Sequence, residues 1–227
     1  MPGMNIAQYI DHTLLKPVAT IDDIKKLCAE ARQYNFFAVC VPPPLVKNAR
    51  QFLQESAVKV ATVIGFPFGY SIGRAKIFEV QQAIQDGADE LDVVINLIAL
   101  KNKAWSYLET EMKHIVEAGH AKEKLVKVII ESGALTDEEI IKCCEIYSAL
   151  GVDFLKTSTG YAEKGASVEA VQLMRKHLPS SMKIKASGGI RTYEWAVQLI
   201  EAGADRLGCS ASVAIVNGEG TDSTKGY

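Results

Sequence analysis

Gly151-Val152-Asp153-Phe154-Leu155-Lys156 has two near-copies elsewhere in the chain, and this repetition is the strongest indication of the architecture. The copies read Gly87-Ala88-Asp89-Glu90-Leu91-Asp92 and Gly203-Ala204-Asp205-Arg206-Leu207-Gly208. The glycine suits the left-handed backbone position that ends a helix. The residues that follow enter an apolar, strand-like run almost at once. Such short connections from helix to strand repeat in proteins with a parallel sheet.

Strand-like and helix-like segments alternate along the whole chain. Apolar, β-branched runs occupy residues 37–41, 58–64, 90–95, 125–130, 152–156, 183–186 and 206–209, with a weaker run at 9–15. Apolar residues at helical spacing start at Ile21 and recur around Ile77, Ile140 and Val171. Eight such units of roughly 25–30 residues predict an α/β protein with a single (β/α)8 TIM barrel. The competing doubly wound sheet usually carries G-x-G-x-x-G after its first strand, and none follows here.

Polar residues mark the starts of three expected helices. Thr136 and Glu139 have the spacing of a capping box, and Ser167 has the position of an N-cap. Ser210 follows the last strand-like run, and we expect it to open the last helix.

Composition limits the classes of function. The chain has 227 residues, 48% of them apolar, and a net charge of −2. No break divides it, so we expect a catalytic barrel domain over residues 1–216 and a flexible tail over 217–227. The near-neutral charge argues against nucleic acid, and no apolar stretch is long enough to span a membrane. Five cysteines without C-x-x-C spacing indicate free thiols in a reducing compartment, and we expect a cytoplasmic protein. The histidines lack the spacing of zinc ligands.

Lys156 and Lys185 are the main candidates for chemistry. Each ends an apolar run and is followed by small residues and glycine, which places an amine at the mouth of a barrel. An ordinary lysine is only about 0.04% neutral at pH 7, whereas a pKa near 7 makes about half of it a nucleophile. Burial and a second ammonium both lower the pKa. The alternative is that both lysines face solvent, or that one only holds a phosphate; two on neighbouring strands favour catalysis.

Asp92 and three glycine-containing loops complete this expected site. A carboxylate inside the apolar run 91–95 is costly unless it is paired, and a neighbouring lysine would pair it. That pair is either a structural ion pair or a group that moves protons. Segments 157–160, 187–189 and 208–210 follow the sixth, seventh and eighth strands. Their backbone N–H groups, with the start of the last helix, predict a phosphate cradle, although each loop alone is also explained as a turn.

Other polar residues at strand ends give weaker signals. Asp11 is expected to orient one lysine, or else to lie at the surface or behind the site, and Glu131 is expected to pair with a lysine. Cys40 is interpreted as a packed thiol rather than a nucleophile, because no histidine is paired with it. Asn96 also ends a strand-like run, and Tyr227 ends the tail, where an inert position is the simpler interpretation.

Several of these segments together resemble the deoxyribose-phosphate aldolase family over nearly the whole chain. The resembling segments are 11–17, 39–41, 64–67, 90–96, 156–160 and 185–190. The resemblance implies that Lys156 forms a Schiff base and that Lys185 lowers its pKa. It also implies that Asp92 and Lys185 transfer protons through a water, and that Gly160, Gly188, Gly189 and Ser210 hold a phosphate.

This resemblance implies reversible cleavage of 2-deoxy-D-ribose 5-phosphate to acetaldehyde and D-glyceraldehyde 3-phosphate, a step of deoxyribonucleotide catabolism. The iminium is the electron sink, so no metal or other cofactor is expected. The partners are then a phosphorylated sugar and an aldehyde, with a homo-oligomer allowed. The chain departs from the family where paired serines are common, since Ala211 follows Ser210, and at Tyr161 after the sixth strand. Some members of the family end in a tyrosine that is proposed to help proton transfer, and Tyr227 is a residue of the same type at the end of this chain.

Three alternatives remain at this stage. Another lysine-dependent aldolase on the same fold would act on a keto-acid or a ketose phosphate and release a different aldehyde. A non-catalytic sugar-phosphate sensor would bind phosphate without forming an adduct. A phosphosugar isomerase is disfavoured, because it needs a carboxylate base more than paired lysines.

Overall fold

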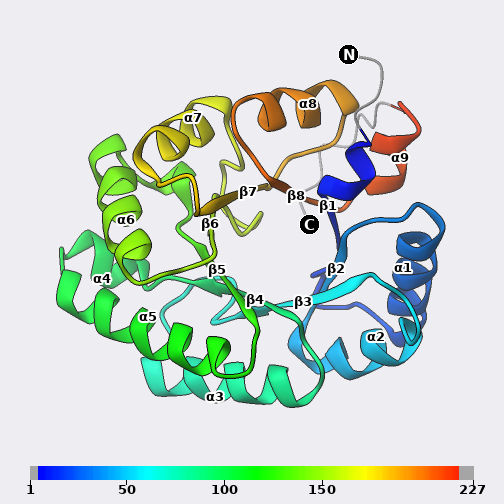
Figure 1. The fold of residues 1–227 in the computed structure, drawn as a ribbon, viewed down its shortest axis with the longest axis horizontal. Helices are drawn as coiled ribbons and strands as arrows, with labels where there is room; N and C mark the ends of the chain where they lie inside the picture. Colours follow the sequence, from blue (N-terminus) through cyan, green and yellow to red (C-terminus); the bar gives the residue numbers. More distant parts are fainter. Residues whose placement is uncertain (1–4, 220–227) are drawn as a thin grey trace.

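The computed structural model describes residues 5–219, which form a closed barrel of parallel strands ordered β1 to β8. Figure 1 shows the strands as a central ring with helices around it. The strands are β1 (Ile10–Thr13), β2 (Ala38–Val41), β3 (Lys59–Ile64), β4 (Glu90–Val94), β5 (Leu125–Ile129), β6 (Phe154–Lys156), β7 (Lys183–Ser187) and β8 (Arg206–Cys209). The predicted TIM barrel is therefore confirmed.

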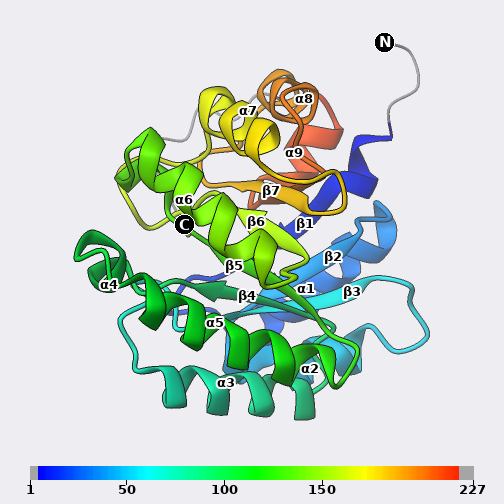
Figure 2. The same ribbon diagram turned by 60° about the vertical axis from the view of Figure 1, so that its left-hand side comes forward.

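The helices lie outside the ring, as Figure 2 shows from a second direction. They are α1 (Ile21–Gln33), α2 (Val46–Phe52), α3 (Gly73–Gln85), α4 (Leu97–Lys101), α5 (Trp105–His120), α6 (Asp137–Ala149), α7 (Val168–His177), α8 (Tyr193–Glu201) and α9 (Ser212–Val216). Short 3-10 turns cover Ile6–Tyr9, Pro43–Leu45 and Ser132–Ala134. Within residues 5–219, no helix has both the length and the apolar character that a membrane span requires.

Capping side chains explain where several helices begin. Thr136 and Glu139 form the predicted capping box of α6, and Ser167 accepts a hydrogen bond from Ala170 N at the start of α7. The prediction for the last helix was wrong, because α9 begins at Ser212 rather than Ser210. Ser210 and Ala211 instead form the connection between β8 and α9.

Strand register determines which side chains enter the barrel, because residues paired across a parallel ladder face the same side of the sheet. Asp92 on β4 is paired with Lys127 on β5, and Lys156 on β6 with Lys185 on β7. Lys185 is paired in turn with Arg206 on β8. These five buried side chains therefore share the inner face, while the main apolar core fills the layer between the strands and the helices.

The inner face is divided into a charged part and an apolar part. Cys40, Ala61 and Val63 on β2 and β3 form a small cluster with Leu15, and Phe66 packs against it. Charged residues on β1 and on β4 to β8 lie on the rest of this face. Small and apolar side chains on β2 and β3 leave space beside the charged groups.

The described structure extends past the proposed domain boundary at residue 216 by three residues. The last helix, α9, ends at Val216. Residues 220–227, including Tyr227, lie outside the described residues, so the division into 1–216 and 217–227 stays a prediction.

Candidate active site

Lys156 and Lys185 meet at one carboxylate. The Nζ atoms of Lys156 and Lys185 donate to Oδ2 of Asp92 at 2.7 and 2.8 Å. Lys127, which the sequence analysis did not select, donates to the other oxygen, Oδ1, at 2.6 Å. Lys156 is 3% exposed, and Lys185 and Asp92 are fully buried. The structure thus brings together the three residues that were expected to carry the chemistry.

Further ion pairs extend this cluster toward the other end of the barrel. Lys185 Nζ also lies 2.5 Å from Asp11 Oδ2, and Lys127 Nζ lies 2.6 Å from Glu90 Oε2. Arg206 contacts both Asp11 and Glu90. Within residues 5–219 the connected cluster holds three acids, Asp11, Glu90 and Asp92, and four bases, Lys127, Lys156, Lys185 and Arg206. Fully ionised, it would carry one uncompensated positive charge.

Lys156 is the base that most easily gives up this extra proton. Burial lowers the pKa of Lys156, Asp92 opposes the shift, and the ammonium of Lys185 lowers the pKa further, so that the net direction is down. Burial would lower the pKa of Lys185 too, but Asp11 and Asp92 raise it well above its ordinary value. The difference follows from the contacts, because in the described cluster Lys156 pairs with one carboxylate and Lys185 with two.

Asp92 stays ionised among these bases. Burial alone would raise the pKa of its carboxyl, but Lys127, Lys156 and Lys185 hold the pKa well below its usual range. The arrangement therefore brings to one oxygen atom an amine with a lowered pKa, a carboxylate with a lowered pKa and a second amine with a raised pKa. Such a set can form an imine and move protons beside it.

The loops after β6 and β7 are joined by hydrogen bonds above the lysines. Ser187 N donates to Thr157 Oγ1 at 3.0 Å, and Ser187 Oγ donates to Ser158 O at 2.6 Å. Gly188, at φ +88°, lies so close to Gly165 that a Cβ on Gly165 would lie 2.2 Å from Gly188 O. The two loops thus contact each other backbone to backbone.

The expected phosphate residues lie on these loops and on the loop after β8. Gly160 and Gly189 have left-handed φ values of 88° and 77°, and Gly189 is exposed, whereas Gly188 is buried. Ser210 is exposed next to the end of β8. The loops therefore present both backbone and a hydroxyl at the C-terminal end of the barrel, although α9 begins beyond Ser210.

Glu131 holds the loop after β6, and the expectation that it pairs with a lysine was wrong. Its carboxylate accepts hydrogen bonds from Thr159 N at 3.2 Å and from Thr159 Oγ1 at 2.5 Å. Burial raises the pKa of this carboxyl, and the bonds from Thr159 oppose that shift. Glu131 has a left-handed backbone with φ 55°, which is unfavourable for a residue with a Cβ. Its function is therefore to anchor Thr159, next to Gly160.

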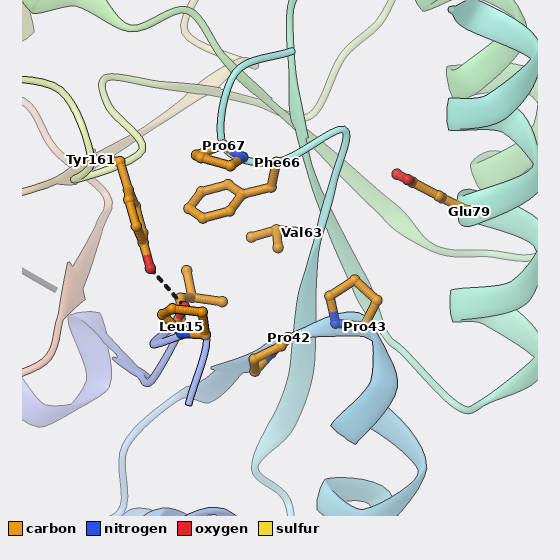
Figure 3. A pocket seen from close by; sticks show the side chains of 9 residues that line it. Leu15, Pro42, Pro43, Val63, Phe66, Pro67, Glu79 and Tyr161 are labelled. Carbon is orange, nitrogen blue, oxygen red and sulfur yellow. Dashed lines mark hydrogen bonds between the residues drawn. The ribbon is translucent and has the colours of Figure 1, made fainter. Parts of the chain in front are cut away.

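A mainly apolar pocket of about 270 Å³ is lined by Leu15 and Val63 of the apolar cluster on the inner face and by Phe66, which packs against it. Figure 3 shows Tyr161 and Leu15, joined by a hydrogen bond, on one side of the pocket and Phe66 and Val63 across from them. Tyr161 OH donates to Leu15 O at 2.9 Å, and its ring meets the edge of Phe66 at 5.4 Å between centroids. Tyr161 is one of the positions where the sequence departs from the pattern of the family that it resembles. Its side chain links the loop after β6 to the segment after β1.

The remaining candidates have structural positions. Burial raises the pKa of the Cys40 thiol, in agreement with a packed thiol. Asn96 is the N-cap of α4, where its Oδ1 accepts from Ala99 N at 3.0 Å. Asp11 contacts Lys185, as the expectation of an orienting role required. Across the described part of the chain, no group of three or more His, Cys, Asp or Glu is arranged to hold a metal ion.

Sequence reasoning missed Glu90, Lys127 and Arg206. Lys127 stands within Leu125-Val126-Lys127-Val128-Ile129, the same signal of a charge inside an apolar run that selected Asp92. Glu90 lies two residues before Asp92, hence on the same face of the strand. Only the closed ring shows that Arg206 on β8 reaches Glu90 on β4, at 3.0 Å.

Comparison with known proteins gives consistent results. The model of the DeoC/LacD family aldolases matches residues 5–218. The deoxyribose-phosphate aldolase of Thermococcus gammatolerans is 54% identical over 220 residues, which are 96% of this chain and 98% of that protein. The deoxyribose-phosphate aldolase of Caldicellulosiruptor saccharolyticus is 52% identical over 218 residues, which are 96% of this chain and 99% of that protein.

Solved structures agree in fold. The aldolase QR15 superposes with a TM-score of 0.90 at 40% identity, covering 95% of this chain and 96% of that one. The deoxyribose phosphate aldolase of Aeropyrum pernix, described as tetrameric, superposes with a TM-score of 0.87 at 34% identity, covering 93% of this chain and 89% of that one.

Proposed function

The chain belongs to the DeoC/LacD family of aldolases, and from this we propose that it reversibly cleaves 2-deoxy-D-ribose 5-phosphate to acetaldehyde and D-glyceraldehyde 3-phosphate, with Lys156 as the Schiff-base lysine. One observation supports the choice of lysine above all others. Among the bases of the cluster, Lys156 has a lowered pKa, whereas the pKa values of Lys127, Lys185 and Arg206 are raised.

In the proposed first step, the neutral amine of Lys156 attacks the C1 aldehyde of the open-chain sugar. The attacking amine gives up a proton, and the carbinolamine hydroxyl takes one and leaves as water to give an iminium, so this step needs a nearby group that accepts and supplies protons. Asp92 and Lys185 are placed for that role, because Asp92 Oδ2 contacts the nitrogen atoms of both lysines. The transfer through a water is carried over from the family resemblance.

In the second step, the C2–C3 bond breaks. Its electron pair moves into the iminium and gives an enamine, while the proton of the C3 hydroxyl leaves and C3 becomes the aldehyde of D-glyceraldehyde 3-phosphate. The enamine takes a proton at C2, and water then releases acetaldehyde and regenerates the amine. The iminium on Lys156 accepts the electron pair of the broken bond, so the side chain of this lysine serves as the electron sink of the reaction.

The phosphate end of the sugar is assigned to the loops after β6, β7 and β8. The left-handed glycines at 160, 188 and 189 give backbone N–H groups close access to an anion. Ser210 offers an exposed hydroxyl beside them. These loops belong to the C-terminal end of the barrel, as do the ends of β6 and β7 that carry the two lysines.

The decisive experiment traps the imine. The protein is incubated with acetaldehyde and borohydride, digested, and the reduced adduct is located by mass. We expect an ethyl group on Lys156 and none in a Lys156→Met variant. An adduct on Lys185 alone would overturn the assignment of the two lysines. The absence of any adduct, together with no release of acetaldehyde from the sugar phosphate, would overturn the proposed function.

Two wider proposals accompany this function. We propose a homo-oligomer, supported by large exposed apolar side chains on and around α3 and α4, namely Phe68, Tyr70, Ile72, Phe78 and Ile98. Light scattering of the purified protein tests it. We also propose the cytoplasm as the place of action, because all five cysteines are buried free thiols.

A further inference from the structure

A buried chain of hydrogen bonds lies on the outer side of β1 and ends at the loop after β8. His12 Nε2 is 2.8 Å from Glu30 Oε2 on α1, and His12 Nδ1 is 2.9 Å from Ser212 Oγ on α9. Ser212 Oγ donates to Cys209 O at 2.9 Å. His12 is 4% exposed and Ser212 is fully buried. Polar groups this deep are retained where their bonds fix a particular arrangement.

This chain of hydrogen bonds is separate from the charged cluster. His12 follows Asp11 on β1, so the two side chains point to opposite faces of the strand. The imidazole packs against the ring of Phe36, with 5.1 Å between centroids. No atom of the proposed chemistry touches it, and its position alone would suggest a purely structural residue.

The hydrogen bond between Ser212 and Cys209 nevertheless encloses Ser210, because Cys209 precedes Ser210 in the chain and Ser212 follows it. Cys209 supplies the carbonyl that accepts from Ser212, and Ser210 and Ala211 form the two-residue span between them. The backbone of β1 holds the near side of this span, because His12 is paired with Cys209 in the barrel. The exposed hydroxyl of Ser210 therefore lies on a short loop. Its first end, Cys209, is paired with β1, and its second end, Ser212, is hydrogen-bonded to His12.

We propose that His12 is a positioning residue, which fixes the loop Cys209–Ser212 so that Ser210 meets the phosphate of the substrate. Glu30 holds the imidazole from the other side, since its carboxylate is the partner of Nε2. Lys26 lies 3.8 Å from the same carboxylate but is mostly exposed. This inference rests on the proposed function, because it assigns Ser210 to the phosphate subsite.

The test compares two substrates that differ only in the phosphate. In a His12→Leu variant, KM for 2-deoxy-D-ribose 5-phosphate should rise about three- to tenfold, as expected for one weakened hydrogen bond. Both kcat and the rate with unphosphorylated 2-deoxy-D-ribose should stay within about twofold, because Lys156, Lys185 and Asp92 keep their contacts. Inorganic phosphate should also become a weaker competitive inhibitor of 2-deoxy-D-ribose cleavage.

A second variant tests the route through Ser212. Ser212→Ala removes the oxygen that joins His12 to Cys209, and it should raise KM for the phosphorylated substrate to a similar extent. Because both substitutions break the same chain, the double variant should be no worse than either single variant. A double variant in which the two effects multiply would overturn the route, and Ser212→Ala also serves where His12→Leu fails to fold.

Thr62→Val is the matched control. Thr62 is fully buried, and its Oγ1 donates to Val41 O at 2.8 Å, so the control also removes one buried hydrogen bond to a carbonyl. It should lower stability without changing the ratio of the two KM values. Equal changes of KM for both substrates in His12→Leu, or none, would overturn the inference alone. A wild-type chain that cleaves neither substrate would overturn the proposed function and this inference with it.

Discussion

Lys156 and Lys185 donate to the same oxygen atom, Oδ2 of Asp92, at 2.7 and 2.8 Å. Because both nitrogen atoms contact the same oxygen, they lie close together, and the ammonium of Lys185 lowers the pKa of Lys156. Asp11 raises the pKa of Lys185, so Lys185 keeps its proton. The repulsion between the two ammonium groups therefore favours loss of the proton from Lys156. This asymmetry supports different chemistry for two lysines that the sequence presents in nearly the same way.

Replacing Lys185 by methionine should raise the pKa of Lys156. Burial would still lower that pKa, but the contribution of the neighbouring ammonium would be lost while the carboxylate of Asp92 remains. The acidic limb of the profile of kcat/KM against pH should move to higher pH, and each unit lowers the rate at pH 7 about tenfold. Lys183→Met is the control on the same strand, because Lys183 is exposed. An acidic limb that stays in place would contradict this account of Lys185.

Replacing Asp92 by asparagine should affect both activity and stability. The substitution leaves Lys127, Lys156 and Lys185 without their common counter-charge, and breaking a buried ion pair costs about 3–5 kcal/mol. We expect at least a hundredfold loss of kcat, because proton transfer is impaired. Urea unfolding and steady-state kinetics measure the two effects. Retention of both stability and kcat would contradict the role of the cluster.

Asp92 also predicts how stability depends on pH. The pKa of its carboxyl is lower in the folded chain than in the unfolded chain, so its ion pairs stabilise the fold fully above the unfolded value, near 4. That contribution is lost as the pH falls from there toward the folded value. The free energy of unfolding should therefore drop as the pH falls below about 4 in the wild type, and less so in Asp92→Asn. Equal drops in the two proteins would show that Asp92 is not the group responsible.

Replacing Glu131 by alanine should loosen the loop after β6. Thr159 would lose the acceptor of its N–H and its hydroxyl, with a loss of about 1–3 kcal/mol for unsatisfied buried groups. Because Gly160 follows directly, KM for the sugar phosphate should rise more than KM for unphosphorylated 2-deoxy-D-ribose. Glu131→Gln keeps one oxygen acceptor and should lie between the wild type and Glu131→Ala. An unchanged KM in both variants would contradict the anchoring role.

Replacing Gly208 by alanine should displace Lys185. A Cβ at position 208 would lie 2.9 Å from Ser187 Cβ and 3.2 Å from Lys185 Cε, closer than well-packed atoms allow. Both the end of β7 at Ser187 and the end of the Lys185 side chain must shift to make room, so kcat should fall. Gly151→Ala is the control, since nothing lies within 4 Å of a Cβ there and only its left-handed backbone is strained. A Gly208→Ala protein with full kcat would show that Lys185 needs no such space.

The repeat that contains Lys156 predicted the barrel because helix ends and strand starts are local features of sequence. The pair Lys156 and Lys185 was also predictable, since consecutive strands of a barrel lie side by side. The contact between Arg206 and Glu90 was not, because it spans the ring from β8 to β4 and depends on closure. The helix α5 was missed although Leu108, Met112 and Ile115 have helical spacing.

The start of the last helix was misplaced for a similar reason. Ser210 is a good N-cap residue by type, but the N-cap position of α9 is taken by Ala211, which has no capping side chain, and Ser212 Oγ donates to Cys209 O. The partner of Glu131 was misjudged because a loop residue, Thr159, competes with the lysines for its carboxylate.

The ring of charges inside the strands has a consequence for the newly made chain. Its members are contributed by β1, β4, β5, β6, β7 and β8, so the last of them arrives only when the final strand closes against the first. The burial and the neighbouring ammonium that lower the pKa of Lys156 exist only in the folded barrel, so in an unfolded chain this amine would hold its proton like an ordinary lysine. The reactivity proposed for Lys156 is therefore a property of the closed barrel and not of the local sequence around it.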